Sequence, residues 1–68
     1  MTELGKRLRE ARGDIPRKEV CENVGISLSA LMMYENGERV PRDSIKVKLA
    51  SFYHKKIEEL FYLPENDT

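Results

Sequence analysis

The chain has 68 residues, of which 40% are hydrophobic and 35% charged, and its 12 basic and 12 acidic side chains give a net charge of zero. This length predicts one small domain (residues 1–68) without room for a ligand-sensing or catalytic unit, and the apolar content excludes a disordered chain. The one cysteine excludes an internal disulfide or a cysteine-built zinc site, and no apolar run is long enough to span a membrane. We therefore expect a cytoplasmic protein that is not an enzyme and uses no metal or cofactor.

The first half of the chain shows apolar residues at helical spacing. One helix is predicted over residues 2–12, followed by a stop at Gly13. Pro16 suits the start of a second helix, because its missing N–H would have no partner there. Gly25 ends that helix, since it adopts a left-handed turn without steric penalty. The predicted inward-facing residues of these helices are Leu4, Leu8, Ala11, Val20, Cys21 and Val24.

The second half predicts three further helices. Ser27 is a good N-cap for a helix that reaches residue 35. After a turn and a loop, Asp43 or Ser44 can cap a fourth helix that ends near His54. A last helix over residues 56–61 is stopped by Pro64, and residues 64–68 form a polar tail. The inward-facing residues are expected to be Leu31, Tyr34, Val47, Leu49, Ala50, Tyr53, Ile57, Leu60 and Phe61. No strand pattern occurs, so we predict an all-α, five-helix bundle.

Residues 17–36 also match a position-by-position pattern that is more specific than helical spacing alone. Counted from Arg17, seven positions meet the requirements of a helix-turn-helix unit: apolar residues toward the shared core, a small residue where the helices touch, and a glycine at the turn. These positions are Val20, Cys21, Val24, Gly25, Ile26, Leu31 and Tyr34. A purely structural bundle would explain the apolar residues equally well. It would not explain why Gly25 falls at the turn with Ser27 capping the next helix.

The residues of this unit also resemble a known family. Residues 24–27 (VGIS), Leu31 and residues 33–37 (MYENG), followed by residues 39–43 (RVPRD) and 57–61 (IEELF), are similar to the Cro/Xre family of bacterial and phage repressors. The resemblance implies a lambda-repressor-like domain that regulates transcription and binds a pseudo-palindromic operator as a dimer. It also implies a structural salt bridge between Arg12 and Glu35.

Three departures from the family pattern stand out. Arg17 occupies a position where glutamine is usual, and arginine can still bind a phosphate there with added charge. Cys21 stands in place of the usual alanine. The loop after Arg12 is about two residues shorter than the common pattern.

The third predicted helix would enter the major groove of DNA. Its outward positions, the candidates for reading bases, are Leu28, Ser29, Met32 and Met33, with Ala30 nearby. None can form the bidentate contacts that identify guanine or adenine, so we expect contacts between apolar side chains and thymine methyl groups, with DNA shape adding specificity. The alternative is that this apolar face binds another protein.

Cationic and polar groups flank that helix in sequence. The candidates for contacting phosphates are Arg17, Lys18, Asn36, Gly37, Arg39 and Arg42, with Asn36 and Gly37 acting through backbone N–H groups. Residues 39–56 hold six basic residues against one acid, so a basic face can exist on a neutral protein.

The remaining signals concern partners. The apolar cluster Phe61, Tyr62 and Leu63 either closes the core or forms a dimer contact.

His54 has no second ligand at metal-binding spacing, so a metal site is not expected. The carboxylates lack a nucleophile or pocket, so catalysis is not expected either. Double-stranded DNA is the predicted partner, with no membrane and no small-molecule ligand domain. The alternative function is a protein-interaction module that keeps the fold with weak or no DNA binding.

Overall fold

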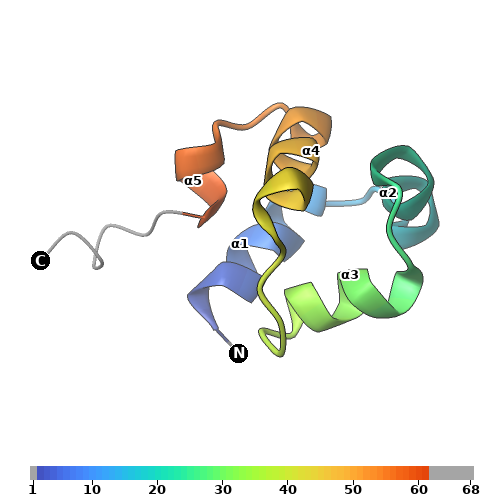
Figure 1. The fold of residues 1–68 in the computed structure, drawn as a ribbon, viewed down its shortest axis with the longest axis horizontal. Helices are drawn as coiled ribbons and strands as arrows, with labels where there is room; N and C mark the ends of the chain where they lie inside the picture. Colours follow the sequence, from blue (N-terminus) through green and yellow to red (C-terminus); the bar gives the residue numbers. More distant parts are fainter. Residues whose placement is uncertain (1, 62–68) are drawn as a thin grey trace, which may run out of the picture.

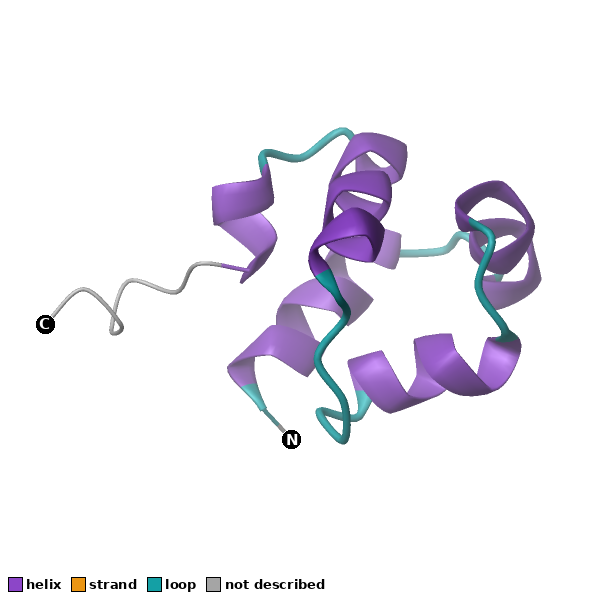
Figure 2. Cartoon of the chain, viewed as in Figure 1, coloured by secondary structure: helices purple, strands orange, loops and turns teal. Residues whose placement is uncertain are grey.

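The computed structural model describes residues 2–61, and within them all regular structure is helical (Figures 1 and 2). The elements are α1 (Glu3–Arg12), α2 (Arg17–Val24), α3 (Leu28–Glu35), α4 (Asp43–Tyr53) and α5 (Ile57–Phe61). This confirms the predicted all-α, five-helix fold. The predicted stop at Pro64 and the tail 64–68 lie outside the described residues.

Two of the helix starts follow directly from the residues there. The Oγ1 of Thr2 accepts a hydrogen bond from the N–H of Gly5 at 3.0 Å, which caps α1. The Oγ of Ser27 accepts from the N–H of Ala30 at 3.0 Å and caps α3, as predicted. Each bond satisfies one of the N–H groups that a helix leaves without an internal partner.

The turn between α2 and α3 is left-handed at Gly25, which has φ 83° and ψ 39°. Its N–H still donates to the carbonyl of Cys21 at 2.8 Å, and the left-handed backbone at Gly25 then ends α2. Ser27 then starts α3 two residues later. In Figure 1, α2 is seen nearly end-on while α3 lies lengthwise, so the two axes cross steeply. The turn predicted from Gly25 is confirmed.

Two predictions about the fourth helix, its N-cap and the burial of Val47, are wrong. Neither Asp43 nor Ser44 caps α4: its N-cap is Arg42, which makes no side-chain capping bond, and Asp43 is already helical. A carboxylate in the first turn still interacts favourably with the helix dipole. Val47 is 58% exposed rather than inward-facing. It lies about 200° around the helix from Leu49, which is fully buried.

The core is formed where the five helices meet: α1 packs on α3 and α5, α2 packs on α3 and α4, and α4 packs on α5. Its buried apolar residues are Leu8, Val20, Val24, Leu31, Tyr34, Leu49, Ala50, Tyr53, Leu60 and Phe61. One charged side chain, Glu35, is buried among them with 0% of its surface exposed. A buried carboxylate needs charged or hydrogen-bonding partners. Glu35 is the last residue of α3, so these partners must lie in or near the helix-turn-helix unit.

Candidate nucleic-acid interface

The helix-turn-helix unit has the predicted packing. Val20 and Val24 of α2 and Leu31 and Tyr34 of α3 are buried. Cys21 and Ile26 are partly buried against the same core, and Gly25 makes the turn between the two helices. All seven positional requirements are therefore met, and the opposite side of α3 faces away from the core.

The outward side of α3 is largely apolar. Leu28, Met32 and Met33 are 51%, 41% and 38% exposed, and Ser29 is exposed beside them. Ala30 is only partly buried but packs against the core, so it presents less surface than the other four candidates. This side of α3 offers methyl and thioether groups and one hydroxyl. Such groups can contact a thymine methyl but cannot make a bidentate hydrogen bond to a base.

Two predicted phosphate contacts lie beside the start of α3. Arg17 and Lys18 are the first residues of α2, and they line one open hollow together with Leu28 and Met32. Lys18 is exposed, whereas Arg17 is partly buried. The fold thus places two cations beside the first turn of the candidate reading helix, at the positive end of the α2 dipole.

The other predicted phosphate contacts follow the end of α3. Backbone N–H groups are already engaged there: Asn36 donates to Met32 O at 2.9 Å and Gly37 to Tyr34 O at 3.2 Å. The backbone route proposed for Asn36 and Gly37 therefore has no free donor in this conformation. Arg39 and Arg42 are exposed, and their side chains form no ion pair with the described residues. These two guanidinium groups remain candidates for contacting phosphates.

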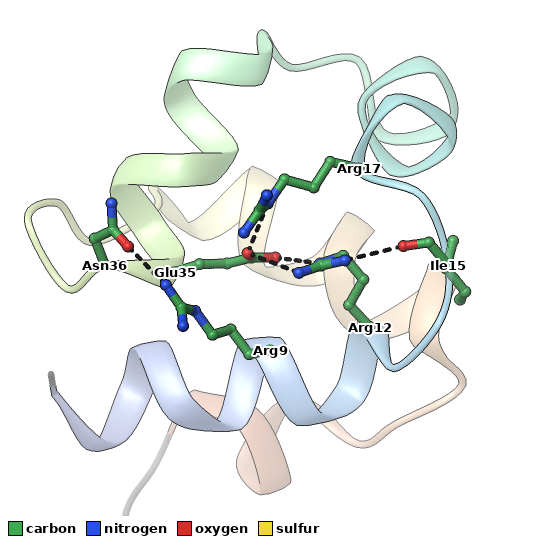
Figure 3. Close-up of polar contacts among 6 residues, drawn as sticks. All are labelled: Arg9, Arg12, Ile15, Arg17, Glu35 and Asn36. Carbon is green, nitrogen blue, oxygen red and sulfur yellow. Dashed lines mark hydrogen bonds and ion pairs between the residues drawn. The ribbon is translucent and has the colours of Figure 1, made fainter.

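A buried ion cluster connects α1, α2 and α3 (Figure 3). Arg12 donates from Nε to Glu35 Oε2 at 2.7 Å and from Nη2 to Glu35 Oε1 at 3.3 Å, which confirms the predicted salt bridge. Arg17 also donates, from Nε to Glu35 Oε1 at 3.1 Å. Arg12 further bonds the carbonyl of Ile15 at 3.1 Å. One carboxylate thereby fixes the ends of three helices relative to each other.

The cluster affects the acid–base properties of its neighbours. The hydrogen bond to Glu35 raises the pKa of Arg12, so the guanidinium stays charged. Burial, reinforced by the negative charge of Glu35, raises the pKa of Tyr53 to about 12. The hydroxyl of Tyr53 is buried and has no hydrogen-bond partner among the described residues. Tyr53 is therefore held neutral, and ionising it inside the fold is unfavourable.

This predicts a loss of stability in alkaline solution that depends on Tyr53. An unfolded tyrosine ionises near pH 10 but the folded one near pH 12, so the stabilisation is complete below pH 10 and is lost as the pH rises toward 12. Between pH 9 and 11, the wild type should lose about 1 kcal/mol more unfolding free energy than Tyr53→Phe. Urea unfolding at both pH values measures this difference. Equal losses in the two proteins would contradict it.

Three features of this region were not predicted from the sequence. The sequence predicts a phosphate contact for Arg17 and does not indicate its bond to Glu35. Arg9 donates to Asn36 Oδ1 at 2.9 Å and ties α1 to the end of α3. Gly5 lies against the backbone of Glu35, so closely that a Cβ would collide with its carbonyl oxygen. A glycine inside a predicted helix was the available signal for close packing.

Phe61 belongs to the core, with 9% of its surface exposed and Lys46 Nζ lying 5.7 Å from its ring centroid. It therefore closes the core and leaves little surface for a dimer contact. Tyr62 and Leu63, the other two residues of that predicted contact, lie outside the described residues.

The described part of the chain lacks two further kinds of functional feature. No group of three or more His, Cys, Asp or Glu side chains within residues 2–61 is placed to hold a metal ion. None of the five helices has the length and apolar character that crossing a membrane requires.

The five helices, with one side of α3 exposed, form a helix-turn-helix domain, a class that includes many DNA-binding regulators. A family model described as helix-turn-helix matches residues 6–60, which is most of the chain. The protein belongs to this Cro/Xre-like helix-turn-helix family. No curated protein and no solved structure was found to match the chain.

Proposed function

We propose that the protein is a sequence-specific transcriptional regulator that reads the major groove with α3 and acts as a repressor by occluding a promoter. The observation that carries this is the arrangement of charge around α3. Arg17 and Lys18 line the hollow beside its first turn, and two exposed arginines, Arg39 and Arg42, follow its last residue in the chain. Groups that bind phosphates on both sides of a helix fix its position in the groove.

We propose that α3 recognises its DNA sequence mainly through apolar contacts with the bases. Leu28, Met32 and Met33 would contact thymine methyl groups, Ser29 would add one hydrogen bond, and Ala30 would contribute close packing to the DNA. A pseudo-palindromic operator would place two copies about 34 Å apart, one on each half-site. The protein would then act as a homodimer at least when bound to DNA.

A selection from randomised duplexes tests the reading mode. We expect enriched sites with thymine-rich half-sites, and Leu28→Ala should weaken binding to the selected site by about 1 kcal/mol or more while leaving binding to random DNA unchanged. Enrichment of guanine-rich sites would contradict the proposal. Leu28 suits this test because it is 51% exposed, so its truncation should leave the fold intact.

Salt dependence tests the phosphate contacts. Replacing Arg39 or Arg42 by alanine should reduce the slope of log K against log salt by about 1 for each residue. Lys55→Ala is the matched control, because it also removes one positive charge but lies in the loop before α5, away from α3. Equal slopes in all three variants and the wild type would contradict the assigned phosphate contacts.

A second candidate is a protein-interaction module without strong DNA binding. The zero net charge and the exposed side chains of Leu28, Met32 and Met33 favour it. A gel shift at two salt concentrations separates the candidates. A salt-dependent shift supports the regulator, and the absence of any shift at low salt supports the interaction module.

A further inference from the structure

The guanidinium group of Arg17 donates a hydrogen bond within the protein from one of its three nitrogen atoms. Its Nε donates to Glu35 Oε1 at 3.1 Å, while its terminal amines make no hydrogen bond to the described residues. The side chain is 35% exposed. Arg17 is therefore fixed along one edge and open at the other, and a guanidinium can bind a phosphate with its terminal amines.

Glu35 is suited to hold that edge in place. Its side chain is 0% exposed, and Arg12 bonds both of its oxygens, at 2.7 and 3.3 Å. The carboxylate cannot turn without breaking these bonds. The two arginines outnumber the one carboxylate, so the cluster keeps a net positive charge that faces the hollow beside α3.

The surroundings strengthen a charged contact at this point. The hollow that contains Arg17 is also lined by three charged residues, Arg12, Lys18 and Glu22, and by Cys21, Leu28 and Met32. The hollow is open to solvent, but DNA bound against Leu28 and Met32 would displace water from it, and a charge-assisted hydrogen bond is stronger where water is excluded. The terminal amines of Arg17 thus lie beside the first turn of α3, where we expect a backbone phosphate if that helix enters the groove.

We infer that Glu35 is a positioning residue for DNA binding: it holds Arg17 by Nε so that the terminal amines meet a backbone phosphate. This rests on the proposed DNA binding. An arginine already fixed in its bound orientation loses less conformational freedom on binding, which corresponds to about a 2- to 10-fold gain in affinity for one side chain.

The test uses two substitutions with the same change in charge. Glu35→Gln and Glu22→Gln each remove one negative charge near the same hollow, but Glu22 is exposed and bonds neither arginine. By charge alone both variants should bind DNA more tightly. If Glu35 positions Arg17, Glu35→Gln should instead weaken binding about 2- to 10-fold while Glu22→Gln tightens it. The probe is a fluorescent mixed-sequence duplex of about 20 base pairs.

A readout without DNA accompanies this measurement. The Nε–H of Arg17 should exchange slowly in nitrogen-15 NMR spectra of the free wild type and rapidly in Glu35→Gln. Amide spectra of each variant establish that it is folded. If Glu35→Gln is unfolded, Arg17→Lys replaces it as the test. Lysine keeps the charge but lacks the planar guanidinium that can bond Glu35 by one edge and a phosphate by the other, so its affinity should fall below that of the wild type while remaining above that of Arg17→Ala.

The outcomes separate the two proposals. Tighter binding by Glu35→Gln, or wild-type affinity in Arg17→Lys, overturns the positioning role. A salt slope that Arg17→Ala leaves unchanged also overturns it, while DNA binding by the wild type still stands. A wild type that shows no salt-dependent binding overturns the proposed function, and the positioning role with it.

Discussion

Arg12→Met is expected to lower the unfolding free energy by about 3 kcal/mol, which for a domain of this size is a fall in Tm of more than about 10 °C. Arg12 bonds both oxygens of Glu35 and is itself only 16% exposed. Without it, the buried carboxylate keeps only Arg17 as a partner. Methionine retains the apolar stem, so the loss measures the charge and its hydrogen bonds more than the packing.

Adding Glu35→Gln to Arg12→Met should recover part of that stability. A neutral amide in the core is less unfavourable than a carboxylate that has lost its main partner. The double variant should therefore melt at a higher temperature than Arg12→Met alone, with a coupling free energy of about 1–3 kcal/mol. Additive effects in this double-mutant cycle would refute the coupling.

Glu3→Gln serves as the comparison for this cycle. It breaks the ion pair of Arg7 with Glu3, whose carboxylate is 45% exposed. Because water solvates an exposed pair, its loss should change the unfolding free energy by less than about 1 kcal/mol. A loss as large as that of Arg12→Met would mean that burial is not the reason for the effect.

Gly5→Ala should destabilise the protein by about 2–3 kcal/mol even though alanine favours helices more than glycine does. In an open helix the change would gain about 1 kcal/mol. Here a Cβ would collide with the carbonyl oxygen of Glu35 and lie 3.0 Å from its carbonyl carbon. Backbone atoms cannot move aside as a side chain can, so α1 and α3 must separate.

Thermal unfolding measures this effect, and the matched control is Lys6→Ala. Lys6 is the exposed neighbour of Gly5 in α1, so its replacement should change Tm by only a few degrees. A Tm for Gly5→Ala at or above that of the wild type would show that α1 and α3 tolerate a wider separation. The displaced end of α3 should also disturb the cluster of Arg12 and Glu35.

The local parts of the fold were predictable because they depend on neighbouring residues. Ser27 caps α3 and Gly25 turns the chain, and each acts through a hydrogen bond or backbone angle within a few residues. Helical spacing identified Leu8, Leu31 and Leu60 as core residues. It failed at Val47, where the inward side of α4 is set by α2 and α5, which spacing within one helix does not reveal.

The candidate interface was predicted in outline and corrected in detail. Leu28, Met32 and Met33 are exposed as expected, because Leu31 and Tyr34 determine which side of α3 is buried. The backbone donors of Asn36 and Gly37 proved to be engaged, since the end of α3 uses them to satisfy its own carbonyls.

The sequence by itself determined that the chain is a helix-turn-helix domain, because helix starts, turns and apolar spacing are short-range properties. Its resemblance to a family added the pairing of Arg12 with Glu35. Only the tertiary structure decided that Arg17 joins that pair, that Arg9 bonds Asn36, and that Gly5 lets α1 approach α3. These contacts join residues 18 or more positions apart. Local patterning cannot specify them, because they depend on how whole helices pack.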